Sequence, residues 1–157
     1  MSNLKVIVLA FIFGITLGTA NARLGETKDQ LLERYGEPFL ENRLGEYPCL
    51  FFKKDEYVIM FILIEGKVES LVISKPTGFL DYAEVTVLLS RNSGGSGFVF
   101  KDGSNKGSRF FKEEDTGRKA ILSPEEKGHT LSISTEKGNL LLAEVAVKKT
   151  GDKLKDF

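Results

Sequence analysis

The stretch from Tyr57 to Ile64 leaves this chain few ways to fold, because all eight of its residues are apolar. A half-buried strand would alternate apolar with polar residues, so an unbroken run of this length predicts a central β-strand that is covered on both faces. Residues 54–56 and 65–67 flank it and are short enough to form hairpin turns. The run therefore predicts an antiparallel sheet with further elements packed on both sides.

The sequence around this run supplies two more strands and a helix. We expect strands over residues 47–53 and 68–74. Thr27 followed three residues later by Gln30 is a capping-box arrangement, and Gly36 is placed to end the helix that Thr27 opens. This helix can cover one face of the central strand, so the other face needs a second element or a second protein.

The same order of elements begins again after Pro76. Asp81 and Glu84 form a second capping-box pattern, and apolar residues at helical spacing follow them. The β-branched residues 85–87 leave a strand open as the alternative for this segment. Gly, Asp and Asn turns then separate further strand candidates at residues 98–101, 108–112, 118–122 and 129–135.

We therefore predict the α+β fold class, with an antiparallel sheet meander and two helices in a single domain over residues 23–150. A tandem helix-plus-meander arrangement would divide this domain into halves 23–75 and 76–150. The sequence is compatible with one continuous sheet and with two packed subdomains. Residues 139–147 fit a helix or a strand, and residues 151–157 are expected to form a solvated C-terminal tail.

The N-terminal region predicts export. Lys5 precedes the apolar residues 6–17, and an Ala-Asn-Ala cleavage site follows. Because a membrane-spanning helix needs about 20 apolar residues, we interpret residues 1–22 as a cleavable signal peptide that is cut between Ala22 and Arg23. The mature protein is then expected to be periplasmic or secreted, with no membrane anchor.

Charge and cysteine content argue against several classes of function. The 22 Lys and Arg residues balance 22 Asp and Glu residues, so nothing in the net charge favours nucleic acid as a partner. Cys49 is the only cysteine, so the domain has no internal disulfide. We expect Cys49 to be buried like a small hydrophobe, with an intermolecular disulfide as the main alternative.

Few residues are candidates for catalysis or for cofactor and metal binding. His129 is the only histidine and is expected to be an ordinary surface residue, with a hydrolase site around it as the alternative. Residues 93–97, Ser-Gly-Gly-Ser-Gly, look like a phosphate-cradling loop, but the strand and helix that such a loop needs are in the wrong order, so a linker or hairpin loop is expected. The acidic residues 113–115 and 125–126 lack the spacing of a calcium loop. We predict a protein that is not an enzyme and has no cofactor or metal.

The phenylalanines give the one positive indication of a site. Phe98 and Phe100 fall on one face of a predicted strand, whereas Phe110 and Phe111 fall on opposite faces of the next. Core packing is the plain interpretation, since the chain needs this apolar surface to fold. The alternative is an exposed patch or groove for a protein partner, which makes these four the candidate partner-binding residues.

About fifteen residues at the start of the predicted domain carry a resemblance to known proteins. They include Gly25-Glu26-Thr27, Leu31 and Arg34-Tyr35-Gly36-Glu37-Pro38, followed by the meander. This pattern resembles the opening of SmpA/OmlA-type envelope modules, the outer-membrane assembly lipoprotein family, and of a group of short uncharacterised exported bacterial proteins. The tandem order of elements further resembles the fold of the β-lactamase inhibitory protein.

The resemblance implies a function by binding and carries over no catalytic residues. Lipoproteins of the envelope family have an acylated N-terminal cysteine, which this chain lacks at its predicted cleavage site, and this counts against a role in outer-membrane assembly. The leading hypothesis is a non-enzymatic exported protein that contacts an unknown protein partner through a sheet face or loops. The first alternative is a secreted enzyme inhibitor whose loops at residues 91–97 and 102–108 converge on one edge, and the second is the hydrolase at His129.

Overall fold

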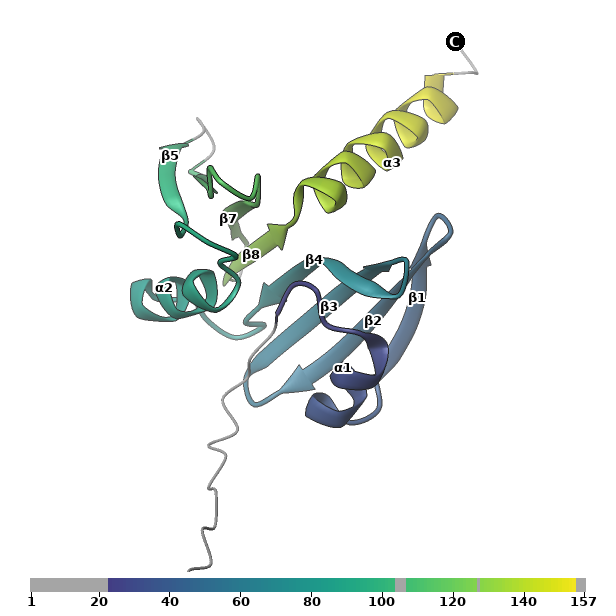
Figure 1. Cartoon of the computed structure of the whole chain (residues 1–157), viewed down its shortest axis with the longest axis horizontal. Helices are drawn as coiled ribbons and strands as arrows, with labels where there is room; N and C mark the ends of the chain where they lie inside the picture. The colour runs from purple at the N-terminus through teal and green to yellow at the C-terminus, as the bar shows by residue number, and fades with distance from the viewer. Residues whose placement is uncertain (1–22, 104–106, 127, 155–157) are drawn as a thin grey trace, which may run out of the picture.

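The computed structural model describes residues 23–103, 107–126 and 128–154. Its centre is one antiparallel sheet with the strand order β1-β2-β3-β4-β8-β7-β6-β5 (Figure 1). Three helices accompany the sheet in the described residues, one more than the two that the sequence predicted. The elements are α1 (Lys28–Tyr35), β1 (Leu40–Leu44), β2 (Tyr47–Lys54), β3 (Tyr57–Ile64), β4 (Lys67–Ser74), α2 (Tyr82–Arg91), β5 (Val99–Gly103), β6 (Arg109–Lys112), β7 (Lys119–Glu125), β8 (Gly128–Ser134) and α3 (Glu136–Leu154).

The chain builds this sheet in two similar passes. Helix α1 is followed by strands β1 to β4, and helix α2 by strands β5 to β8. The last strands of the two passes, β4 and β8, pair antiparallel in the middle of the sheet, with Leu71 opposite Ile133. The α+β class and the tandem order are thus present, in one continuous sheet. Because β8 returns to the centre, the strand order is not a single sequential meander.

Both predicted capping boxes are confirmed. The Thr27 hydroxyl accepts a hydrogen bond from the backbone N–H of Gln30, and the Gln30 side chain accepts one from the Thr27 N–H. Asp81 and Glu84 do the same at the start of α2, with distances of 2.8 and 2.6 Å. Gly36 ends α1 with φ +77°, which favours glycine. The strand alternative for residues 85–87 is wrong, because the cap and the helical spacing outweigh the β-branched residues.

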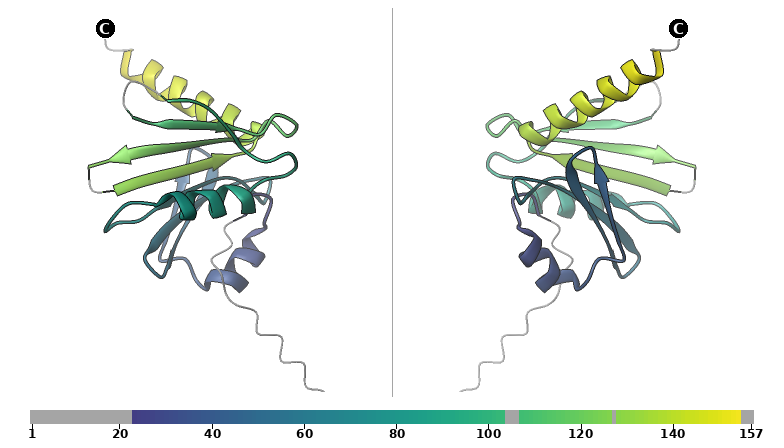
Figure 2. Two further views of the ribbon diagram at one scale, coloured as in Figure 1. Left: turned by 90° about the vertical axis from the view of Figure 1, so that its left-hand side faces the viewer. Right: turned by 90° about the vertical axis from the view of Figure 1, so that its right-hand side faces the viewer.

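Helices cover both faces of the central strand β3, as its apolar run required. Helices α1 and α2 lie on one face of the sheet and α3 on the other (Figure 2). Phe61 packs in the first core cluster with Leu31 of α1 and Val85 of α2. Its neighbour Ile62 points to the opposite face and packs with Leu141 of α3.

One strand of the sheet was not predicted from the sequence, and one helical segment was compatible with a helix or a strand. Strand β1 was not predicted, and four of its five residues are exposed. Residues 139–147 form part of α3, so the strand alternative there is wrong, and the helix includes residues 151–154 of the expected tail. Within the described ranges, no helix combines the length and apolarity that crossing a membrane requires. The predicted signal peptide, residues 1–22, lies outside the described residues, of which Arg23 is the first.

The single cysteine lies in the core on the α3 side of the sheet. Cys49 is 4% exposed and packs with Ile62, Ile64 and Leu141. Burial raises the pKa of its thiol, which keeps the thiol protonated and unreactive. The prediction of a buried Cys49 is therefore confirmed.

Candidate binding groove

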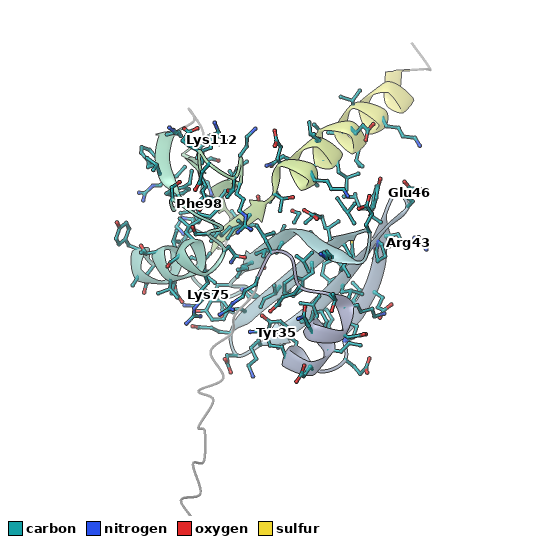
Figure 3. The ribbon with its side chains drawn as sticks, viewed as in Figure 1. Tyr35, Arg43, Glu46, Lys75, Phe98 and Lys112 are labelled. Carbon is teal, nitrogen blue, oxygen red and sulfur yellow. The ribbon has the colours of Figure 1, made fainter. Side chains whose placement is uncertain are left out.

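An open groove of about 1460 Å³ lies between α2 and the second half of the sheet. Strands β5 to β8 supply its floor and α2 supplies one wall. The glycine loop, residues 93–97, borders the groove where α2 ends, and Phe98 follows it toward β5 (Figure 3). The side chains that matter below are Tyr82, Val85 and Leu89 from α2, and Phe98, Phe100, Arg109, Phe111, Leu122 and His129 from the sheet side.

Three of the four predicted partner-binding residues line this groove. Phe100 and Phe111 are cross-strand partners whose ring centroids are 5.8 Å apart in an edge-to-face arrangement. Phe100 is 54% exposed, whereas Phe98 and Phe111 also pack against the core. Phe110 is not part of the groove, because neighbouring residues of a strand point to opposite faces. It lies opposite Ile121 on the other face of the sheet and is 36% exposed.

The sequence analysis did not single out two further aromatic residues. Tyr82 is 81% exposed and belongs to the stripe of α2 that faces the groove with Val85 and Leu89. These residues follow helical spacing, so the stripe was visible in the sequence once α2 was known to be a helix. Phe79 is 60% exposed and its ring lies edge-on to His129, with centroids 4.9 Å apart. No local pattern in the sequence brings these two residues together.

A buried carboxylate holds the glycine loop in place. The side chain of Glu113, in the turn between β6 and β7, is fully buried. Asp115 in the same turn accepts hydrogen bonds from the backbone N–H and the hydroxyl of Ser96, both at 2.8 Å. The donors to Glu113 are the backbone N–H groups of Gly94 (2.9 Å), Gly95 (3.1 Å) and Gly97 (3.0 Å) and the hydroxyls of Ser93 and Thr116.

These hydrogen bonds decide the charge state of Glu113. Burial alone raises the pKa of a carboxyl group, but the bonds from Ser93, Thr116 and the loop backbone outweigh it and lower the pKa of Glu113 to about 2. The loop therefore does cradle an anion, as its glycines suggested, and the anion is a side chain of the same chain. This fixes the loop as a rigid end of the groove rather than a passive linker.

The wall formed by α2 is anchored at its C-terminal end by Asn92, which is 1% exposed. Its side-chain amide accepts a hydrogen bond from the N–H of Leu24 and donates one to the carbonyl of Leu88. Its own carbonyl accepts a hydrogen bond from the Arg118 guanidinium at 2.6 Å. The end of α2 is thus tied to the N-terminal segment and to the β6–β7 turn.

The N-terminal end of α2 is anchored as well. Lys75 contacts the carboxylates of Glu84 at 2.9 Å and Glu56 at 3.0 Å, and lies beside α2 (Figure 3). The segment that leads into α2 forms a backbone bridge to β8 between Gly78 and Gly128. Both ends of the wall are therefore fixed before any partner binds.

One ring nitrogen of His129 has no partner among the described residues. The ring is half-buried rather than an ordinary surface group, and its Nδ1 is buried without a hydrogen-bond partner. The hydrolase alternative needs a Ser, Asp or Glu side chain within hydrogen-bond reach of the imidazole, and in the part of the chain that is described none reaches Nδ1. In the same part of the chain, no group of three or more His, Cys, Asp or Glu residues is arranged to hold a metal ion.

The two loops of the inhibitor alternative lie at opposite ends of the β5–β6 hairpin. Val99, which follows the glycine loop, pairs with Lys112, next to the turn that carries Glu113. The other loop, residues 102–108, joins the far ends of the two strands, where Gly103 pairs with Arg109. Residues 104–106 of that loop lie outside the described residues, and the described parts do not converge on one edge.

No protein-family model and no curated protein matches this chain. Among solved structures it is similar to a cysteine-rich secretory protein from Staphylococcus aureus, with 10% identity and a TM-score of 0.42 over 73% of this chain. It is also similar to an extracellular protein containing an SCP domain from Bacillus anthracis, with 14% identity and a TM-score of 0.39 over 74% of this chain. The chain spans 45% of the length of each. Similarity of this degree does not indicate a function for this chain.

Proposed function

We propose that this chain is an exported, non-enzymatic protein that binds a segment of another protein in the groove between α2 and strands β5–β8. The observation that carries the proposal is the pair of exposed aromatic side chains at this groove, Tyr82 and Phe100, which are 81% and 54% exposed. Exposed apolar side chains gathered at a concave surface are typical of protein interaction sites. Tyr and other aromatic residues also dominate the binding energy of such sites.

Rigidity of the groove supports the same proposal. Binding costs free energy whenever a loop or side chain must be ordered, so a groove that is already fixed binds more tightly for the same contacts. The hydrogen bonds of Glu113 fix the glycine loop, and Asn92 and Lys75 anchor the two ends of α2. A partner segment therefore meets a surface that is shaped in advance.

Export is the second part of the proposal and depends on the N-terminal sequence. Residues 1–22 have the cation, apolar run and small-residue cleavage site of a signal peptide. Cleavage before Arg23 places the folded domain in the periplasm or outside the cell. The partner is then an envelope or extracellular protein.

Site-specific photocrosslinking tests the proposal. A benzophenone amino acid replaces Phe100 in the mature protein, residues 23–157, which is irradiated with the envelope and secreted fractions of its host. We expect one dominant crosslinked protein. Its yield should be at least fivefold lower when Tyr82→Ala and Thr86→Asp change the exposed side chains of the wall, since hot-spot residues typically contribute about 2 kcal/mol or more.

Phe39 provides the matched control position. It is 60% exposed, as accessible as Phe100, but it lies beside Phe51 on the first half of the sheet. A benzophenone at position 39 is expected to give no such product. If both positions capture the same proteins equally, or if the wall variants leave capture at position 100 unchanged, the groove is not the binding site.

A further inference from the structure

We propose that the segment bound in the groove carries a carboxylate beside bulky apolar side chains, and that Arg109 pairs with this carboxylate. The inference rests on the proposed function and deepens it by naming the chemistry of the partner. It is carried by the position of one cation on a mostly apolar groove floor.

Arg109 lies on the floor of the groove. In the sheet register it stands opposite Leu122, which in turn stands opposite Leu131, and both leucines belong to the core cluster on the α2 face. Arg109 therefore shares the face of Phe111, two residues along β6, rather than that of Phe110. Arg109 itself is exposed, and its side chain makes no ion pair or hydrogen bond with the residues whose side chains are described.

Three neighbouring cations are paired. Lys101 and Lys112 both contact Glu114, at 2.5 and 2.6 Å. Arg118 lies 3.9 Å from Glu113 and also donates to the backbone of Asn92. Lys119 also makes no ion pair with the described residues, but it stands opposite Lys112 and therefore lies on the face of Phe110, away from the groove. Arg109 is thus the one cation among the residues that line the groove.

The carboxylates that border the groove are already engaged. Asp81 caps the first turn of α2. Glu113 and Asp115 hold the glycine loop through its backbone N–H groups. These contacts fix α2 and the loop, so neither can release a carboxylate to Arg109 without loosening the groove. Among the described carboxylates at the groove, none is free to pair with Arg109, so the proposal assigns the counter-charge to the partner.

The apolar surface of the groove and the guanidinium of Arg109 together define the occupant. An entirely apolar segment would fill the space beside Phe100 and Phe111 but would strip water from the guanidinium of Arg109 without replacing its hydrogen bonds, which is costly. A small anion would pair with Arg109 and leave the aromatic surface exposed. A segment with a carboxylate between bulky apolar side chains satisfies both, because the guanidinium binds a carboxylate through two parallel hydrogen bonds.

Fluorescence anisotropy with two labelled peptides tests this inference on the mature protein, residues 23–157. One peptide alternates Phe with Glu, and the other alternates Phe with Gln. We expect the Glu peptide to bind at least tenfold more tightly, since a hydrogen bond between a guanidinium and a carboxylate is stronger than one to a neutral amide. This preference should disappear in Arg109→Gln and shrink as salt is added, because the pair is partly exposed.

Arg43→Gln is the matched control, since Arg43 is exposed on β1 and bonds only to its own hairpin, through the carbonyl of Glu46. It should keep the full preference for the Glu peptide. If both peptides bind equally and Phe100→Ala weakens both, the groove binds proteins but Arg109 does not select a carboxylate. If neither peptide binds but dodecanoate binds in an Arg109-dependent way, the occupant is a free amphiphile and the inference is overturned. Photocrosslinking at position 100 then tests the proposed function separately.

Discussion

Replacing Glu113 by alanine should lower the free energy of unfolding by about 4 kcal/mol, because it leaves several buried backbone donors without an acceptor. The carboxylate is fully buried and accepts hydrogen bonds from Gly94, Gly95 and Gly97 as well as from two hydroxyls. Water cannot reach these N–H groups unless the loop moves. Urea unfolding of the mature protein, followed by circular dichroism, measures the loss.

Glu114→Ala is the matched control for this substitution. Glu114 is the next residue of the same turn, but its side chain is 52% exposed and contacts only Lys101 and Lys112. Exposed ion pairs contribute little to stability, so this variant should unfold close to the wild type. Equal losses for the two variants would show that the loop does not depend on the buried carboxylate.

The same carboxylate should make the domain sensitive to acid. The pKa of Glu113 falls from an ordinary value of 4.5 to about 2 in the folded chain, so between these values the unfolded chain binds more protons than the folded chain. Stability therefore rises with pH in this window and is lost as the pH falls from about 5 toward 2. Glu113→Gln should flatten this dependence. Glu114 also has a lowered pKa, from its contacts with Lys101 and Lys112, and 0.5 M salt should screen that exposed contribution but not the buried one.

Local sequence patterns predicted most of the elements that build the groove. The apolar run of β3 and the two capping boxes are short-range signals, and each appears where the residues placed it. Strand β1 was missed because Glu41, Asn42 and Arg43 carry no apolar alternation. It forms an edge of the sheet through backbone pairing with β2, which a local pattern does not reveal.

The groove itself was only partly predictable. Strand alternation separated Phe110 from Phe111 in the sequence. Helical spacing would also place Tyr82 with Val85, but Tyr82 was not among the predicted site residues. The bond between Glu113 and the glycine loop joins residues 16 to 20 positions apart, in two different turns. No local pattern marks such a contact, and the acidic residues 113–115 were considered only as a calcium loop, whose spacing they lack. The pairing of β4 with β8 is longer in range still, and it decides that the two halves share one sheet.

A second large loss is expected for Gly128→Ala, about 3 kcal/mol, because the added methyl group has no space. A Cβ at position 128 would lie 2.5 Å from the carbonyl oxygen of Gly78 and 2.9 Å from that of Lys75. Both are backbone atoms and cannot rotate away as a flexible side chain would. The bridge between Gly78 and Gly128 must therefore open, and this bridge holds the segment that leads into α2.

Gly103→Ala separates this steric effect from the general effect of adding a methyl group to a strand. Its Cβ would meet the nearest atom, the carbonyl oxygen of Ser108, at 3.5 Å, which is an ordinary contact. The variant should therefore differ from the wild type by less than about 1 kcal/mol in urea unfolding. Because Gly128 fixes the entry to α2, its variant should also crosslink weakly from position 100 at temperatures where it is still folded. If Gly128→Ala keeps its full stability but crosslinks weakly, the substitution disturbs only the position of α2. If both the stability and the crosslinking are unchanged, the contact between Gly78 and Gly128 is not close.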